Sequence, residues 1–158
     1  MEIQAIVDRF ELYAQKLKDL DHDPENFRER SFFQLDFEDL QTAIKEGCKF
    51  PLMLFLTPDI DKSGGMDNLS ESWEGSYIIL DKKVTTKAAC LNKCKLISDK
   101  VFNKMLAEVE DFYQCDSLEA GGGGIGPTTD QLYGWVVQFG FSKPYNGEVN
   151  ANDWEDGI

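Results

Sequence analysis

The sequence is poor in histidine and in basic residues. Only one histidine, His22, occurs among 158 residues, and 16 Lys plus Arg stand against 29 Asp plus Glu, which gives a formal net charge of −13. Such a surface repels phosphate backbones, because nucleic-acid affinity depends on Lys and Arg that neutralise phosphates. We therefore expect no sequence-specific nucleic-acid binding, and no binding to anionic membranes. An acidic chain suits a basic protein partner, or needs none, because net charge also serves solubility.

Long apolar runs are absent as well. No stretch of about 18 apolar residues occurs, so the sequence predicts no membrane-spanning helix. The N-terminal stretch MEIQAIVDRFELYAQ has early acidic residues and lacks the layout of a signal peptide, so we expect a protein that is cytoplasmic when made. A chain of this size needs no disulfides, and the four cysteines are predicted to be free buried thiols: Cys48, Cys90, Cys94 and Cys115.

Motifs that carry chemistry are missing too. Cys90 and Cys94 supply at most half of a zinc site, and no second half exists in the sequence. Catalysis by a Ser-His-Asp triad would require His22, which lies in the charged turn DHDPE and is predicted to be exposed. The run GGGGIG at 121–126 lacks the Lys-Ser/Thr of a phosphate loop, so 120–130 is predicted to be a flexible linker. We predict no catalytic residue, no metal ligand and no cofactor, and hence no enzyme.

Helical periodicity is present in three segments. Apolar residues recur at spacings of three and four over 2–20, 37–47 and 85–113. Gly47 stands where a C-terminal cap is expected, and Thr85 or Thr86 is suited to cap the last segment. That last helix would run some 40 Å at about 1.5 Å per residue, long enough to cross a whole sheet.

Strand patterns fill much of the rest. The apolar run 49–57 and the alternating run 72–82 are predicted to pair as an antiparallel hairpin with a long acidic connection. Segment 131–143 is predicted to be a further strand, and 31–37 a short one. The aromatic face of segment 131–143 is expected to pack under the long helix, and it consists of Tyr133, Trp135, Phe139 and Phe141.

These elements predict an α+β fold. We expect a small, mostly antiparallel sheet with an N-terminal helix and one long helix packed on one face. The length suits a single domain, which we place at 1–146. The remainder, 147–158, has no periodicity and many turn formers, and is predicted to be a polar C-terminal tail.

The stretch PDIDKSGGMDNLSE, 58–71, resembles a calcium-binding loop. Asp59, Asp61 and Ser63 match positions 1, 3 and 5 of an EF-hand loop, but position 12 is Ser70, and Glu71 comes one residue late. An EF-hand loop joins two helices, whereas both flanks are strand-like here. The preferred interpretation is a solvated hairpin loop whose acidic residues oppose aggregation; calcium binding by 59–71 stays an open alternative.

The order of elements resembles phage tail-terminator or tail-completion proteins and, more loosely, the small neck proteins of contractile tails. The resemblance is carried by the helix IQAIVDRFELYAQKL, the hairpin FPLMLFLT to SYIILD, the helix CLNKCKLISDKVFNKMLAEVEDF and the strand LYGWVVQFGFSKPYN, which together cover most of 3–146. Segment 21–36 and the terminal NDWEDGI have no counterpart in that layout.

The resemblance implies a non-enzymatic subunit of a homo-oligomeric ring, which caps the tail tube, meets the head connector and becomes part of the virion. The acidic DIDKSGG loop would then make contacts, or line the lumen and keep DNA from adhering. The alternative is an immunity- or inhibitor-type protein that docks on a basic protein through electrostatic complementarity.

Overall fold

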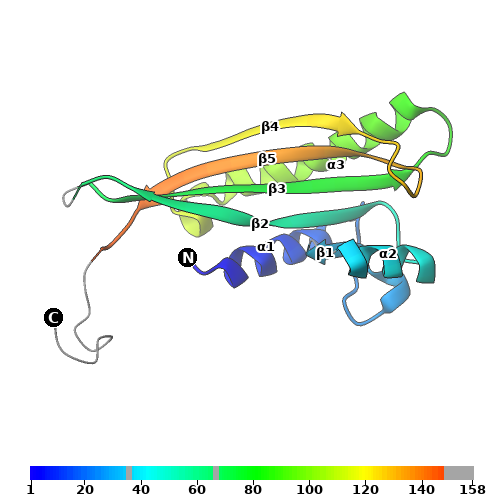
Figure 1. Cartoon of the computed structure of the whole chain (residues 1–158), viewed down its shortest axis with the longest axis horizontal. Helices are drawn as coiled ribbons and strands as arrows, with labels where there is room; N and C mark the ends of the chain where they lie inside the picture. The colour runs from blue at the N-terminus through cyan, green and yellow to red at the C-terminus, as the bar shows by residue number, and fades with distance from the viewer. Residues whose placement is uncertain (35–36, 66–67, 148–158) are drawn as a thin grey trace.

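The computed structural model describes residues 1–34, 37–65 and 68–147 (Figure 1). Its elements are, in chain order, α1 (Ile3–Lys16), a 3₁₀ turn (Phe27–Glu29), β1 (Phe32–Gln34), α2 (Phe37–Glu46), β2 (Leu52–Ser63), β3 (Ser70–Lys82), α3 (Lys87–Ala107), a π-helical turn (Val109–Tyr113), β4 (Leu118–Ile125) and β5 (Leu132–Pro144).

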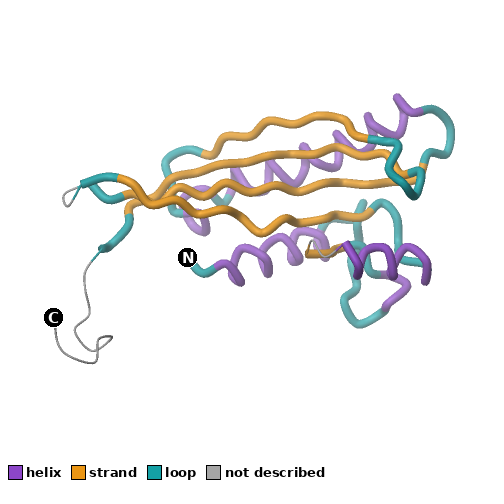
Figure 2. The backbone as a smooth tube through the Cα atoms, viewed as in Figure 1, coloured by secondary structure: helices purple, strands orange, loops and turns teal. Residues whose placement is uncertain are grey.

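The strands of the described residues form one sheet in the order β1-β2-β3-β5-β4 (Figure 2). All neighbouring pairs are antiparallel except β1 with β2, which is parallel. The predicted α+β class, with a mostly antiparallel sheet, is therefore confirmed. The short β1 and the helix α2 lie in the long connection between α1 and β2, and β1 joins the sheet beside β2.

The helices α1 and α3 pack on the same face of the sheet, α1 against β2 and α3 against β3 and β5 (Figure 1). The core between them is built from side chains at alternate strand positions, as the pleat of a strand requires. Phe10 of α1 is fully buried at its centre, where its ring lies 4.3 Å from that of Phe55 and 5.5 Å from that of Phe139. The predicted packing of the aromatic face of β5 under the long helix is confirmed, although Trp135 is only half-buried.

A second, smaller apolar cluster lies on the opposite face, at one end of the sheet. Ala43 of α2 packs there with Leu52 and Leu54 of β2 and with Leu80 of β3. The helix ends at Glu46, and Gly47 adopts a φ of +96°, as expected for a glycine cap. Most of this second face is left without a helix over it (Figure 1).

The helix ends follow the local chemistry of the chain. The hydroxyl of Thr86 accepts the backbone N–H of Ala89, which confirms one of the two predicted caps of α3. The predicted helix 85–113 is regular only to Ala107, and Val109–Tyr113 continues as a π-helical turn. Helix α1 stops at Lys16 rather than at residue 20, because Leu17 adopts an extended conformation (φ −80°, ψ 114°); its N–H still donates the last helical hydrogen bond, to the Tyr13 carbonyl.

The hairpin of β2 and β3 is confirmed, but its connection is shorter than predicted. Strand β2 continues through Pro58 to Ser63, beyond a register shift between Leu56 and Asp59. Ile60, opposite Trp73, packs against the core and so holds the extension in the sheet. The acidic stretch is therefore largely strand.

The predicted flexible linker at 120–130 is wrong. Leu118–Ile125 forms β4, which pairs along its whole length with β5. The glycines allow Trp135 to cover this strand, since a Cβ on Gly122 would lie 2.6 Å from the indole Nε1. The predicted tail 147–158 lies outside the described residues from 148 onward.

The prediction of an exposed His22 is also wrong, because its side chain is 1% exposed. The His22 N–H donates to the Ala14 carbonyl, which folds the charged turn back onto α1. The ring Nδ1 accepts the backbone N–H of Ser31 at 2.9 Å, and Nε2 lies 3.3 Å from a carboxylate oxygen of Glu11. The acidic side chains next to His22 in the turn are exposed to solvent.

Burial of His22 predicts a pH-dependent stability. Burial lowers the pKa of His22, and the Glu11 carboxylate opposes this shift without cancelling it. Just below pH 6.5 the unfolded chain therefore binds more protons than the folded chain, so the free energy of unfolding falls as the pH drops through this window.

His22→Leu, which leaves the Ser31 N–H without an acceptor, should cost about 1–3 kcal/mol at pH 7.5. This deficit relative to the natural chain should shrink between pH 7.5 and pH 5.5, as measured by urea denaturation. A deficit that does not change with pH would contradict the assignment of a neutral His22.

Candidate functional site

In the described residues, the stretch that resembles a calcium-binding loop runs mostly along the strands β2 and β3. Asp59, Asp61 and Ser63 occupy alternate positions of β2 and pair with β3, so they follow an extended strand rather than a loop. Met66 and Asp67 lie outside the described residues. Within the described ranges, no group of three or more His, Cys, Asp or Glu side chains is placed to hold a metal ion.

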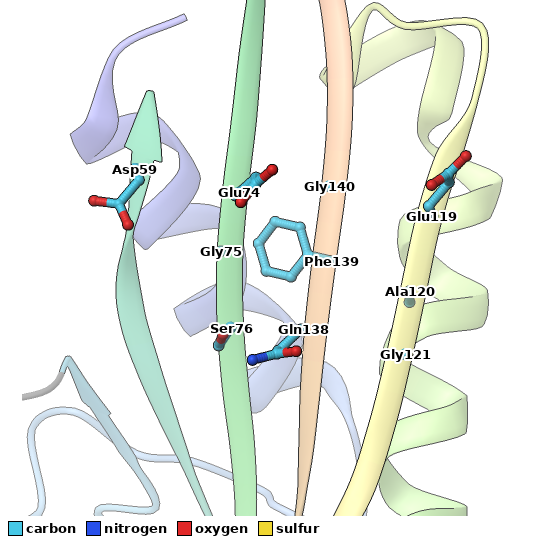
Figure 3. Close-up of a pocket in the computed structure, with 10 residues that line it drawn as sticks. All are labelled: Asp59, Glu74, Gly75, Ser76, Glu119, Ala120, Gly121, Gln138, Phe139 and Gly140. Atoms are coloured by element: carbon cyan, nitrogen blue, oxygen red, sulfur yellow. The ribbon is translucent and has the colours of Figure 1, made fainter. Parts of the chain in front are cut away.

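The sheet face turned away from α1 and α3 carries a row of acidic side chains instead. Asp59 of β2 is opposite Glu74 of β3, and Glu74 and Glu119 of β4 both face Gly140 of β5, which separates them. All three carboxylates are exposed, and none forms an ion pair with any described residue. Figure 3 shows them pointing out of the same face of the sheet.

Between these carboxylates the face is hollowed. The hollow measures about 480 Å³, and apart from Phe139 its floor is built from residues with small or polar side chains: Gly75, Ser76, Ala120, Gly121, Gln138 and Gly140. The missing side chain of Gly140 opens the space between β3 and β4 (Figure 3). Because like charges across a sheet repel one another, this face is suited to meet basic groups or to repel phosphates.

Strand β4 is the second unusual feature, because it ends the sheet and nothing in the described part of the chain pairs with its outer side. Its run Gly121–Gly124 contains neither Pro nor charge, the usual protections of a free edge. A Cβ at Gly121 or Gly123 would meet no atom within 4 Å. Packing therefore does not require glycine at these two positions.

The other border of the sheet is formed by the three-residue β1 and, beyond it, by a protected stretch of β2. Beyond the three residues paired with β1, β2 carries the irregularity at Leu56/Asp59, Pro58 and the charged Asp59 and Asp61. Such features oppose pairing with another strand. The contrast within a single sheet singles out β4 as the edge that is open to a partner.

Apolar side chains of α3 line the side of β4. Leu91 would lie 3.2 Å from a Cβ on Gly124, and Phe102 and Leu106 follow on the same side of the helix, about three and four turns later. Leu106 is 45% exposed, while Leu91 and Phe102 are partly buried against the core. A partner strand on β4 would cover part of this apolar strip.

The remaining candidates are structural. All four cysteines are free and buried, as predicted. The Cys94 thiol lies 3.8 Å from the Tyr133 carbonyl, and burial raises its pKa to about 12, which makes it a poor nucleophile near neutral pH. No helix in the described ranges is long and apolar enough to cross a membrane.

No family model and no curated protein matches the sequence. What the protein does is therefore inferred from its two distinctive surfaces, the acidic face and the free edge of β4.

Proposed function

We propose that this protein is a non-enzymatic structural subunit of a phage or phage-like tail, of the tail-terminator or neck-completion type. The free edge of β4 is the observation that carries the proposal, because an unprotected edge is a ready template for pairing with another chain. In this proposal copies of the chain join into a homo-oligomeric ring, with β4 as one side of each contact between subunits. Tail-tube and head-connector proteins would be the other partners.

The acidic face suits the inner surface of such a ring. Asp59, Glu74 and Glu119 leave unpaired negative charge on the side of the sheet that α1 and α3 do not cover. Facing a lumen, these charges would keep DNA from adhering during passage, because they offer phosphates no cation.

The same carboxylates favour a second candidate function. An immunity- or inhibitor-type protein would present Asp59, Glu74 and Glu119 to a basic target, and complementary charge would speed the encounter. A chain with this function is expected to be a monomer that binds one basic protein.

Size-exclusion chromatography with light scattering tests the ring proposal. The natural chain should elute as a multiple of its 17.9 kDa mass, whereas Gly121→Lys combined with Gly123→Lys should elute as a monomer. Both positions have room for a side chain, and lysine on an edge opposes pairing. A natural chain that stays monomeric at high concentration, or a double variant that assembles as well as the natural chain, would contradict the proposal.

Gly65→Lys, compared with Gly123→Lys alone, provides the control for charge. Gly65 lies in the short connection between β2 and β3, and it also has no atom within 4 Å of a Cβ. Gly65→Lys should leave the assembly unchanged. A monomeric natural chain that binds one basic protein, and loses it on Glu74→Lys, would favour the inhibitor function instead.

A further inference from the structure

We propose that the groove between α1 and α3 binds a small amphipathic carboxylate. Its apolar chain would lie between the two helices, and its carboxylate would lie among lysines at the rim. This site is on the helical side of the sheet, and it depends neither on the acidic face nor on the edge of β4.

The groove has the size and lining of a small-molecule site. It measures about 420 Å³, within the usual range of about 300–1,000 Å³ for ligand pockets. Leu12 and Leu17 of α1 and its C-terminal turn form one wall, and Val101 of α3 lies on the other. Leu12 lines the groove and is 37% exposed, so its apolar side chain is free to contact a ligand there.

The rim concentrates positive charge in an acidic protein. Lys16, Lys100 and Lys104 all line the groove, although acidic residues outnumber basic ones by 29 to 16 in the chain. The Lys100 ammonium is 2.6 Å from Asp19, and that of Lys104 is 2.8 Å from Glu108. Lys16 has no ion-pair partner among the described residues, so it is available to an anion.

The floor of the groove offers a ligand no further polar partner. The Tyr13 hydroxyl donates to Glu108 at 2.6 Å and lies 3.2 Å from that of Tyr113. Arg9 and Lys104 face the Glu108 carboxylate and complete its interactions. A ligand that enters must therefore be apolar along its body and charged only at the end that reaches the rim.

The dimensions favour a small molecule over a peptide helix. The backbone from Lys100 of α3 to the capping residue Glu108 spans about 12 Å, enough for an extended chain of about eight to ten carbons. A helix about 10 Å wide would fill about 900 Å³ over that length, whereas the groove measures about 420 Å³. Decanoate matches this length and carries one negative charge, so it is the probe that we choose.

Methyl NMR of the full-length chain, labelled at Leu and Val, tests the proposal by titration with decanoate below its micelle concentration. The methyl signals of Leu12, Leu17 and Val101 should shift together and saturate with a Kd on the order of 1 mM. Decyltrimethylammonium has the same chain and the opposite charge, and it should bind at least tenfold more weakly. Equal affinity for the two, or shifts elsewhere only, would overturn the proposal.

Variants test the role of the rim. Lys16→Gln with Lys104→Gln should weaken decanoate binding at least fivefold, whereas Lys83→Gln with Lys95→Gln, which removes the same charge away from the groove, should not change it. Leu12→Asp should abolish binding, with circular dichroism as the check on folding. Unchanged decanoate binding by Lys16→Gln with Lys104→Gln would overturn the proposal. So would methyl signals of the groove that shift with an acidic amphipathic peptide but not with decanoate.

Discussion

Phe10→Ala is expected to lower the free energy of unfolding by about 3–5 kcal/mol. The Phe10 side chain is fully buried and joins α1 to the sheet through Phe55 of β2, Tyr77 of β3 and Phe139 of β5. Alanine would remove these ring contacts and leave a cavity at a point where three strands meet the helix, so the loss includes both transfer and cavity terms. Urea denaturation followed by circular dichroism measures the change.

Leu12→Ala on the same helix is the matched control. Leu12 is 37% exposed, so its truncation should cost less than about 1 kcal/mol. Similar losses for the two variants would show that α1 does not pack on the sheet through Phe10.

Glu71→Ala is expected to cost about 3–5 kcal/mol, because it leaves a buried charge without its partner. Glu71 and Lys143 are only 7% and 8% exposed, and the ammonium lies 3.6 Å from the carboxylate. The same carboxylate accepts the indole N–H of Trp73 at 2.6 Å, so alanine removes two interactions at once. Urea denaturation of the variant at neutral pH gives the loss directly.

The paired change Glu71→Gln with Lys143→Met separates the two contributions. Gln keeps an acceptor for Trp73, and Met fills the space of the lysine without its charge, so the double variant should lie within about 1 kcal/mol of the natural chain. A double variant as unstable as Glu71→Ala would mean that the charged pair itself stabilises the fold, and would contradict the assignment of the loss to an unpaired ammonium.

Strong periodicity made much of this fold predictable. The alternation in 72–82 and 131–143 places large side chains on one face, and the stripe of 85–113 matches it, so the β2-β3 hairpin, β5 and α3 all follow from local patterns. The boundaries were less predictable. The extension of β2 past Pro58 depends on Ile60 meeting the core near Trp73, a contact between segments that no local pattern contains.

The candidate site could not be predicted from local patterns in the sequence. Strand β4 has the composition of a linker, and only its pairing with β5 makes Gly121–Gly124 a strand. A weak signal was present in Leu118 and Ile125, the apolar residues at its two ends. The acidic row likewise depends on register, because Asp59 and Glu74 meet across a hairpin and Glu119 comes from β4, far along the chain from both. Composition predicted an acidic surface but not its position.

Amide hydrogen exchange along β4 tests most directly whether its edge is the assembly contact. In dilute solution, where the chain is monomeric, the outward-facing half of the Leu118–Ile125 amides should exchange rapidly, because no described strand pairs with them. If the proposed ring forms as the chain concentration rises, these amides should become protected, while those of the exposed connection 64–65 should not. Outward-facing amides that exchange equally fast at every concentration would contradict assembly through this edge.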